Sequence, residues 1–194
     1  MLTLDKVSFA YGDKAILRDV SLTIPAGRAV CFTAPSGTGK TTLLRLLAGL
    51  EVPQSGSVRN KAARTAVVFQ EDRLLPWLTV EQNVATVCST EDALPYLQAV
   101  ELADARDKYP AQLSGGMRRR AALARALAFG GDVLLLDEPF TGLDSDLRER
   151  VAAAIRSRFE EKTTLLITHD EEDAALLGAT VVPLTFPLQG DVII

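Results

Sequence analysis

The chain has little of what marks secreted or membrane-spanning proteins. Its 194 residues include only two cysteines, Cys31 and Cys88, which lie far apart and form no metal or redox motif. This usage indicates a reducing, cytoplasmic compartment. No apolar run approaches the ~20 residues of a membrane-spanning helix, and residues 1–5 do not resemble a signal peptide.

A strong net charge is absent as well. The net charge is −4, which argues against a broad electrostatic contact with DNA, RNA or an anionic membrane. The hydrophobic fraction of 47% is ordinary for a globular protein, and we find no internal repeat, low-complexity tract or linker. The length predicts one domain over residues 1–194, large enough to bury a core.

The most informative stretch is 34–42, Ala-Pro-Ser-Gly-Thr-Gly-Lys-Thr-Thr. A short apolar run, 29–32, precedes it. Leucines with the spacing of one helical face follow it, namely Leu43, Leu46, Leu47 and Leu50. Strand, glycine-rich loop and helix in this order form the context of a phosphate-binding loop.

The residue types in this loop suit a bound phosphate. Gly37 and Gly39 allow a tight backbone whose N–H groups point inward. Lys40 adds a positive charge for the β- and γ-phosphates, and the Thr41 hydroxyl can bind Mg²⁺. The predicted nucleotide contacts are Pro35, Ser36, Gly37, Thr38, Gly39, Lys40, Thr41 and Thr42. The alternative is a glycine-rich turn that binds nothing.

The pattern along the chain predicts an α/β fold with a core at about 1–70 and 131–194. Strands are expected at 2–9 (an edge strand), 16–24, 29–32, 55–58 and 65–69, which suggests a small antiparallel sheet beside a parallel core. Residues 71–130 are helical in pattern and form an insertion, with helices over 80–84, 91–102 and 116–129. The core resumes with strands at 133–136 and 164–167, helices at 145–160 and 171–177, and a strand-like tail from 181.

Two carboxylates follow the buried strand 133–136. Because the carboxyl ends of parallel strands face the ligand crevice, we expect Asp137 to hold Mg²⁺ and Glu138 to accept a proton from the attacking water. His169 follows another core strand; a lone histidine is usually structural, but this place favours a bond to the γ-phosphate or the water. Gln70 also ends a strand, where its amide can join the Mg²⁺ shell or position water.

A second anion site is predicted at Ser114, Gly115 and Gly116, which precede an Ala/Leu-rich helix and offer a hydroxyl and helix N–H groups. One compact core cannot use this site, because it lies in the helical insertion. A two-fold dimer can, if each subunit offers it to the other's γ-phosphate. The arginines at 118–120 are either a solvated face or partly near that interface.

Together these motifs resemble the ordered set of the ABC-type ATPases, over about residues 2–185. The resemblance rests on 34–42, Gln70, 113–117, 134–139, 143–144 and His169. Segment 74–84 and the Ser-Gly-Gly-Met sequence resemble the ATP-binding subunits of nitrate, sulfonate and taurine importers. The resemblance implies a P-loop NTPase with a RecA-like parallel-sheet core, an N-terminal antiparallel β subdomain and an inserted α-helical subdomain at about 71–130.

The resemblance also implies an activity and partners. It implies an ATPase that uses ATP and Mg²⁺, forms a homodimer around ATP, and lies on the inner face of the cell membrane. There it would drive a separate permease, and indirectly serve a solute-binding protein, without a nucleic-acid partner. Catalytic roles fall to Glu138, His169, Gln70 and Lys40.

The resemblance also implies roles for two surface features. Tyr11 matches the family's aromatic residue that stacks on adenine; the alternative is a simple exposed tyrosine. An apolar patch is expected to receive the permease's cytoplasmic coupling helix, the alternative being core packing. The patch consists of Leu74, Leu75, Trp77 and Leu78.

The chain departs from the family pattern in four places. Ala34 replaces the first loop glycine, although Pro35 favours an extended residue 34, where alanine fits. Met117 replaces the commoner glutamine, the segment 59–65 is short, and the chain ends soon after His169. Two other functions stay open: a non-transport ABC ATPase acting on DNA or ribosomes, and an ATP-gated dimerisation module with weak or no hydrolysis.

Overall fold

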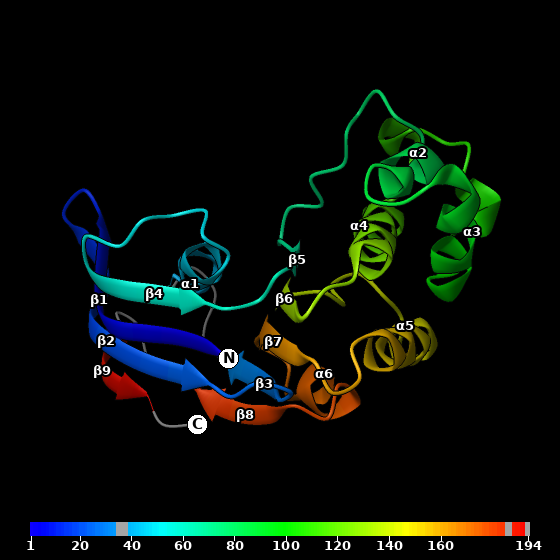
Figure 1. The fold of residues 1–194 in the computed structure, drawn as a ribbon. Helices are drawn as coiled ribbons and strands as arrows, with labels where there is room; N and C mark the ends of the chain where they lie inside the picture. The colour runs from blue at the N-terminus through cyan, green and yellow to red at the C-terminus, as the bar shows by residue number, and fades with distance from the viewer. Residues whose placement is uncertain (34–38, 185–187, 193–194) are drawn as a thin grey trace.

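The fold is built on two sheets, shown in a computed structural model that describes residues 1–33, 39–184 and 188–192. A five-stranded sheet has the order β5-β6-β7-β3-β8, and a four-stranded sheet has the order β4-β1-β2-β9 (Figure 1). The first comprises β3 Ala29–Thr33, β5 Thr65–Val68, β6 Val133–Asp137, β7 Thr163–Thr168 and β8 Thr180–Pro183. The second comprises β1 Leu2–Tyr11, β2 Lys14–Ile24, β4 Ser55–Asn60 and β9 Leu188–Val192.

The five-stranded sheet is parallel at each of its strand pairings and is covered on both faces. Every residue of β6 is buried, as expected for a strand inside such a sheet. Successive side chains point to opposite faces: Leu134 and Leu136 pack with the core under the helices. Val133 and Leu135 pack with the core on the other side, shared with the second sheet.

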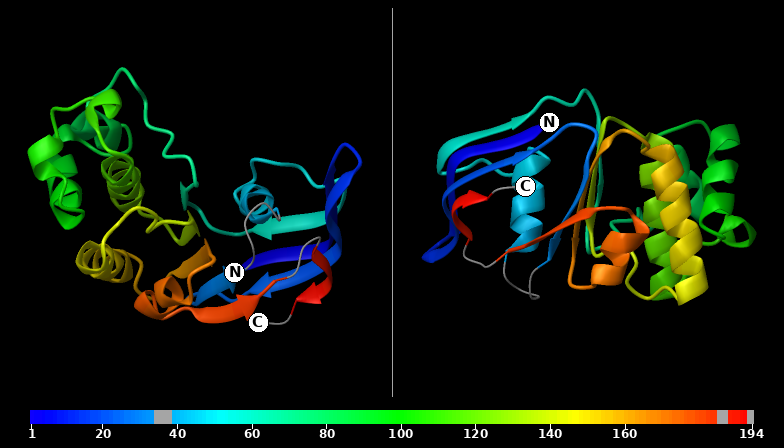
Figure 2. Two further views of the ribbon diagram at one scale, coloured as in Figure 1. Left: turned by 180° about the vertical axis from the view of Figure 1, so that it is seen from behind. Right: turned by 90° about the horizontal axis from the view of Figure 1, so that it is seen from below.

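Helix α1, Lys40–Leu47, lies between the two sheets (Figure 2, right). Its apolar residues Leu43, Leu44, Leu46 and Leu47 are all buried. The expected extension of this face to Leu50 is wrong, because the helix ends at Leu47 and Gly49 turns the chain at φ +73°. Leu50 is left 58% exposed.

The predicted helical insertion is present. It contains α2 Val80–Ala85, α3 Thr90–Ala99, 3₁₀ turns at Ala103–Ala105 and Pro110–Gln112, and α4 Gly115–Phe129. Thr79, Ser89 and Ser114 cap the starts of the three α-helices with side-chain oxygens that accept backbone N–H groups, which explains where each helix begins. Figure 1 shows α4 nearer to the parallel sheet than α2 and α3.

Two further helices, α5 Ser145–Arg158 and α6 Glu171–Leu176, complete the cover of the parallel sheet. Among the helices in the described ranges, none combines the length and apolar character needed to cross a bilayer. The predicted combination of a parallel core, an antiparallel sheet and inserted helices is confirmed.

The expected edge position of the first strand is wrong. β1 pairs with β2 on one side and β4 on the other, both antiparallel, so β4 and β9 are the edges of this sheet. The strand predicted at 55–58 is present as β4, two residues longer than expected. β4 pairs with β1 and thereby places β1 inside the sheet.

Candidate nucleotide site

The predicted site residues meet where β6 and β7 end and α1 begins. The Lys40 ammonium lies 3.1 Å from Glu138 Oε1, and the Thr41 hydroxyl donates to Asp137 Oδ2 at 2.6 Å. These pairs join residues almost one hundred positions apart in the sequence. The structure therefore brings the described end of the predicted phosphate loop against the predicted acidic pair.

The local backbone explains how these side chains are presented. Gly39 caps α1 in a left-handed conformation, at φ +109°, which glycine adopts without steric cost. Glu138 follows the buried strand at φ +50°, an uncommon conformation for a residue with a Cβ. Its N–H donates to Ile167 O in β7 at 2.8 Å. The chain thus turns sharply at Glu138, immediately after β6.

Glu138 is a buried carboxylate with cationic and polar partners. It is 7% exposed, and His169 Nδ1 lies 2.9 Å from each of its oxygens. Burial alone would raise the pKa of Glu138, but the hydrogen bonds from His169 and Lys40, with the Lys40 charge, lower it below its usual value. Glu138 is therefore ionised at neutral pH and able to accept a proton.

The other carboxylate is in a different environment. Asp137 is 1% exposed, and burial raises its pKa, with the Thr41 hydrogen bond acting in the opposite direction. Two neighbouring acids are thus shifted apart, which is common in catalytic sites. The side chain of His169 is 65% exposed, so that it faces solvent at the rim.

A magnesium ion would fit beside Thr41 and Asp137. Mg²⁺ prefers oxygen ligands and is usually held by one or two carboxylates together with phosphates and water. The hydroxyl and carboxylate are 2.6 Å apart. No group of three or more acidic, histidine or cysteine side chains suited to a metal occurs in the described part of the chain. This donor set therefore suits a metal that arrives with a phosphate.

A cavity of about 310 Å³ opens at this site. It is lined by Tyr11, Lys14, Ile16, Gly39, Lys40, Thr41, Thr42, Gln70, Asp137 and Glu138. Tyr11 is 45% exposed and packs edge-on against Phe9, with ring centres 4.9 Å apart. Its hydroxyl donates to Glu51 at 3.1 Å. The antiparallel sheet thus supplies an aromatic wall next to the predicted phosphate site.

A larger cavity of about 640 Å³ lies near Arg28, Thr164 and Thr180. These residues stand at the amino ends of β3, β7 and β8. Ligands of open α/β sheets bind at the opposite, carboxyl ends. We therefore place the site in the smaller cavity.

Ser114, Gly115 and Gly116 do not line this cavity. The Ser114 side chain caps α4 by accepting from Met117 N at 3.2 Å, and Ser114 and Gly115 are exposed. Gly116 packs closely on the loop after β6, since an added Cβ would lie 2.7 Å from Gly142 O. Within one chain this motif stays apart from the other site residues.

Some predicted contacts cannot be placed. Pro35, Ser36, Gly37 and Thr38, with Ala34, lie outside the described residues. Gly39, Lys40, Thr41 and Thr42 lie within them and all line the cavity.

Two residues around the site, Arg119 and Thr168, were missed by the sequence analysis. Arg119 belongs to the arginine run interpreted as a solvated face or an interface, yet it is only 3% exposed. Its guanidinium bonds the backbone carbonyls of Phe69, Asp137 and Glu138. Its place on the inward face of an Ala/Leu-rich helix was the signal that could have identified it.

Thr168 was missed too. Its hydroxyl lies 2.9 Å from Asp173 Oδ2 and 3.3 Å from Glu138 Oε2. Burial raises the pKa of Asp173, against the effect of the Thr168 hydrogen bond. Thr168 thus links the carboxylate in the site to a second buried acid behind it.

Comparison with known proteins agrees with this geometry. Residues 17–141 match the ABC transporter family. An aliphatic sulfonates import ATP-binding protein of Rhodococcus jostii is 44% identical over 193 residues, covering 95% of this chain and 79% of its own. A protein of the same description from Granulibacter bethesdensis is 45% identical, with the same coverage of both chains.

Solved structures share the fold. A dimeric structure of the ABC transporter cassette MJ0796 superposes with a TM-score of 0.86 at 29% identity, covering 99% of this chain and 96% of that one. A dimeric post-hydrolysis state of MJ0796, bound to ADP and Pi, gives 0.87 at 28% identity, covering 97% and 96%. The family match, these relatives and the arrangement of Lys40, Asp137 and Glu138 agree: the chain belongs to the ABC transporter family, as an ATP-binding subunit of the kind that hydrolyses ATP.

Proposed function

We propose that this chain hydrolyses ATP with Glu138 as the general base and drives import through a separate membrane permease. The observation that carries the proposal is the convergence of Lys40 with Glu138 and of Thr41 with Asp137 at one cavity. A phosphate loop and an acidic pair at the end of a buried strand are the parts that phosphoryl transfer requires.

Lys40 and the loop backbone bind the β- and γ-phosphates in this proposal. Thr41, Asp137 and Gln70 would hold Mg²⁺, which neutralises charge on the phosphate oxygens when bound. Tyr11 would stack on the adenine ring, since its exposed face borders the same cavity. Each role follows from a donor, acceptor or ring that the cavity presents.

Glu138 accepts a proton from the attacking water in this mechanism. Its depressed pKa keeps it ionised, with the burial penalty outweighed by His169 and Lys40. His169 Nδ1, within 2.9 Å of both carboxylate oxygens, fixes the direction of the carboxylate. Gln70 lines the same cavity and would align the water.

A second copy of the chain would complete the site. Ser114 and Gly115 are exposed at the start of a 15-residue helix, where free N–H groups favour an anion. The similarity to the dimeric MJ0796 cassette supports a two-fold pair in which these residues, with Gly116, reach the partner's γ-phosphate. Hydrolysis would then release the pair, and the cycle of closing and opening would be the mechanical output.

The permease would dock on the apolar patch at 74–78. Trp77 is 69% exposed, while Leu74 packs against the helical core. Asn83 anchors the turn: its side chain accepts from Leu75 N at 2.8 Å and donates to the carbonyls of Leu75, Leu78 and Thr79. An anchored turn thus presents one exposed indole, which suits an aromatic anchor in an interface.

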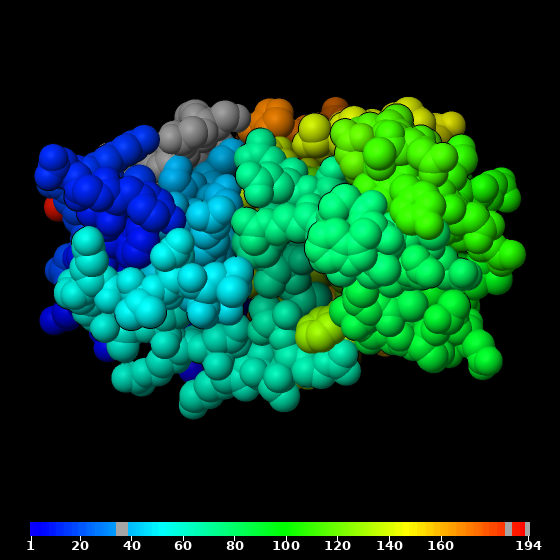
Figure 3. Space-filling view, turned by 90° about the horizontal axis from the view of Figure 1, so that it is seen from above, coloured from blue at the N-terminus to red at the C-terminus, as the bar shows by residue number. Residues whose placement is uncertain are grey.

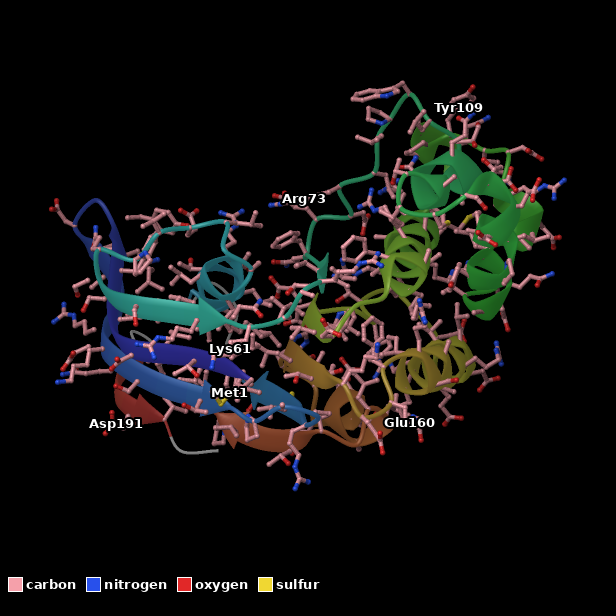
Figure 4. All side chains as sticks on the ribbon, in the orientation of Figure 1. Met1, Lys61, Arg73, Tyr109, Glu160 and Asp191 are labelled. Atoms are coloured by element: carbon pink, nitrogen blue, oxygen red, sulfur yellow. The ribbon has the colours of Figure 1, made fainter. Side chains whose placement is uncertain are left out.

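The location of this patch supports the same proposal. Figure 3 shows the teal segment that includes it bordering both the cyan segment, which carries α1 and β4, and the green helices. Exposed Tyr109 stands on the same side, at the top of the helical segment in Figure 4. We propose one ABC ATPase domain over 1–194, with a helical subdomain at 71–130. It would be peripheral on the inner face of the membrane, with a solute-binding protein as an indirect partner.

Phosphate release in the presence of ATP and Mg²⁺ tests the proposal. Glu138→Gln keeps the shape of the side chain but replaces the carboxylate with an amide, which is a much weaker base. We therefore expect hydrolysis to fall by about 10²–10⁴-fold while ATP binding persists. Equal hydrolysis by the two proteins would contradict the role of Glu138. A wild type that pairs with ATP without releasing phosphate would instead favour the dimerisation module.

A further inference from the structure

Arg119 makes an unusual set of contacts for a charged residue. It lies in α4, five residues after Ser114, and is 3% exposed. Its Nη2 donates to Asp137 O at 2.7 Å and to Glu138 O at 2.6 Å. Its Nη1 donates to the carbonyl of Phe69. One guanidinium therefore bonds three backbone carbonyls on two separate segments.

These carbonyls belong to the segments that carry the chemistry. Phe69 precedes Gln70, and Asp137 and Glu138 are the acidic pair. Asp72 Oδ1, 3.6 Å from Nη1, faces the same guanidinium and balances part of its charge. Burial lowers the pKa of Arg119, but a guanidinium stays charged in proteins, so its donors are always available to these carbonyls.

The backbone at Glu138 depends on such support. At φ +50° it occupies a sparsely populated conformation, which persists only when surrounding contacts determine it. The Glu138 N–H is held by Ile167 O at 2.8 Å, and the Glu138 C=O is held by Arg119 at 2.6 Å. These two constraints fix the backbone from which the Glu138 side chain extends.

We infer that Arg119 is a positioning residue for ATP hydrolysis, which fixes the backbone of Glu138 and ties it to the Gln70 segment and to α4. This inference rests on the proposed role of Glu138 as the general base. Arg119 acts through the backbone, because its Nη1 and Nη2 donate to backbone carbonyls.

The neighbouring Arg120 offers a matched control. It lies in the same helix, and its Nη1 also donates to backbone carbonyls, those of Val100 and Glu101. These carbonyls lie at the C-terminal end of α3, away from the site. Arg120→Met and Arg119→Met thus each remove a guanidinium that bonds backbone carbonyls. Only Arg119→Met removes the hydrogen bonds to the backbone of Asp137 and Glu138.

Steady-state hydrolysis of ATP by the full chain tests the inference. We expect Arg119→Met to lower kcat by about 10–100-fold, because a displacement of about 1 Å in a catalytic group has effects of this size. KM for ATP should change by less than about threefold, since Lys40 and Thr41 keep their contacts. Arg120→Met should lower kcat by less than about twofold, and Arg119→Lys, with one donor nitrogen, should fall between.

Equal kcat values for the two methionine variants would overturn the inference, as would an Arg119→Met variant with raised KM and unchanged kcat. If Arg119→Met does not fold, Arg119→Lys decides, and a wild-type kcat for it overturns the inference. Glu138→Gln is measured in the same series. Hydrolysis by Glu138→Gln at the wild-type rate would contradict the proposed function, whereas strongly impaired Glu138→Gln beside fully active Arg119→Met contradicts only the role of Arg119.

Discussion

Asp137→Asn should make the protein more stable and less active at the same time. Asp137 is 1% exposed at the end of β6, and burial opposes its negative charge more than the Thr41 hydrogen bond and nearby cations favour it, so that its pKa is raised. Asparagine keeps an oxygen for the Thr41 hydroxyl and carries no charge. The substitution therefore removes a desolvation cost and keeps the 2.6 Å hydrogen bond.

The size of the effect depends on pH. One pKa unit corresponds to about 1.4 kcal/mol of unfolding free energy, and 1 kcal/mol moves the melting temperature of a protein of this length by about 2–4 °C. Because the folded-state pKa lies above the unfolded value of 3.8, the folded protein takes up a proton as pH falls. The cost of the charge is thus full at pH values above the folded pKa, decreases as pH drops through it, and is gone below the unfolded value.

Thermal unfolding followed by circular dichroism at pH 8 and near the unfolded pKa of 3.8 measures this effect. We expect Asp137→Asn to melt above the wild type at pH 8, with a smaller difference at the lower pH. Glu149→Gln, which changes an exposed carboxylate on α5, should match the wild type at both. Hydrolysis dependent on Mg²⁺ should fall sharply for Asp137→Asn. A variant that is less stable at pH 8, or whose advantage grows as pH falls, would refute this reasoning.

Three further substitutions have distinct expected results. Asn83→Ala removes the fully buried amide that holds the 75–79 turn. It should lower the free energy of unfolding by about 2–4 kcal/mol. An unchanged free energy of unfolding in denaturant would contradict this expectation. Gly116→Ala puts a methyl 2.7 Å from Gly142 O; it should lower the melting temperature, whereas Gly115→Ala, which meets only Arg118 at 3.9 Å, should not. Trp77→Ala should leave folding and hydrolysis unchanged but weaken binding to the permease in detergent, and full binding would remove the patch from the proposal.

Much of the site could be predicted because each motif is local and parallel strands bring their ends together. Gly39, Lys40 and Thr41 form a contiguous pattern, and Asp137 and Glu138 directly follow four buried aliphatic residues. The expectation of parallel strands was enough to predict that residues far apart in the sequence would meet at one edge of the sheet. The Lys40–Glu138 and Thr41–Asp137 contacts agree with that expectation.

The rest depended on tertiary context. Arg119 stands between two other arginines, and three consecutive arginines usually form a solvated face; only the packing of α4 on the parallel sheet decides which one is buried. The inner position of β1 depends on its pairing with β4; the sequence predicts the strand at 55–58 but not its partner. Leu50 differs, because the cause is local: it fits the helical period but follows Gly49, whose positive φ ends the helix.

The central claim is that each ATP site is completed by a second copy of the chain, and mixing two inactive variants tests it most directly. Lys40→Ala damages the phosphate loop, and Gly115→Asp places a negative charge at an open position of α4. Each variant alone should be inactive. In an equal mixture about half of the pairs are mixed, each with one intact site, so phosphate release should recover to about a quarter of the wild-type rate. A mixture as inactive as its separate components would contradict the account.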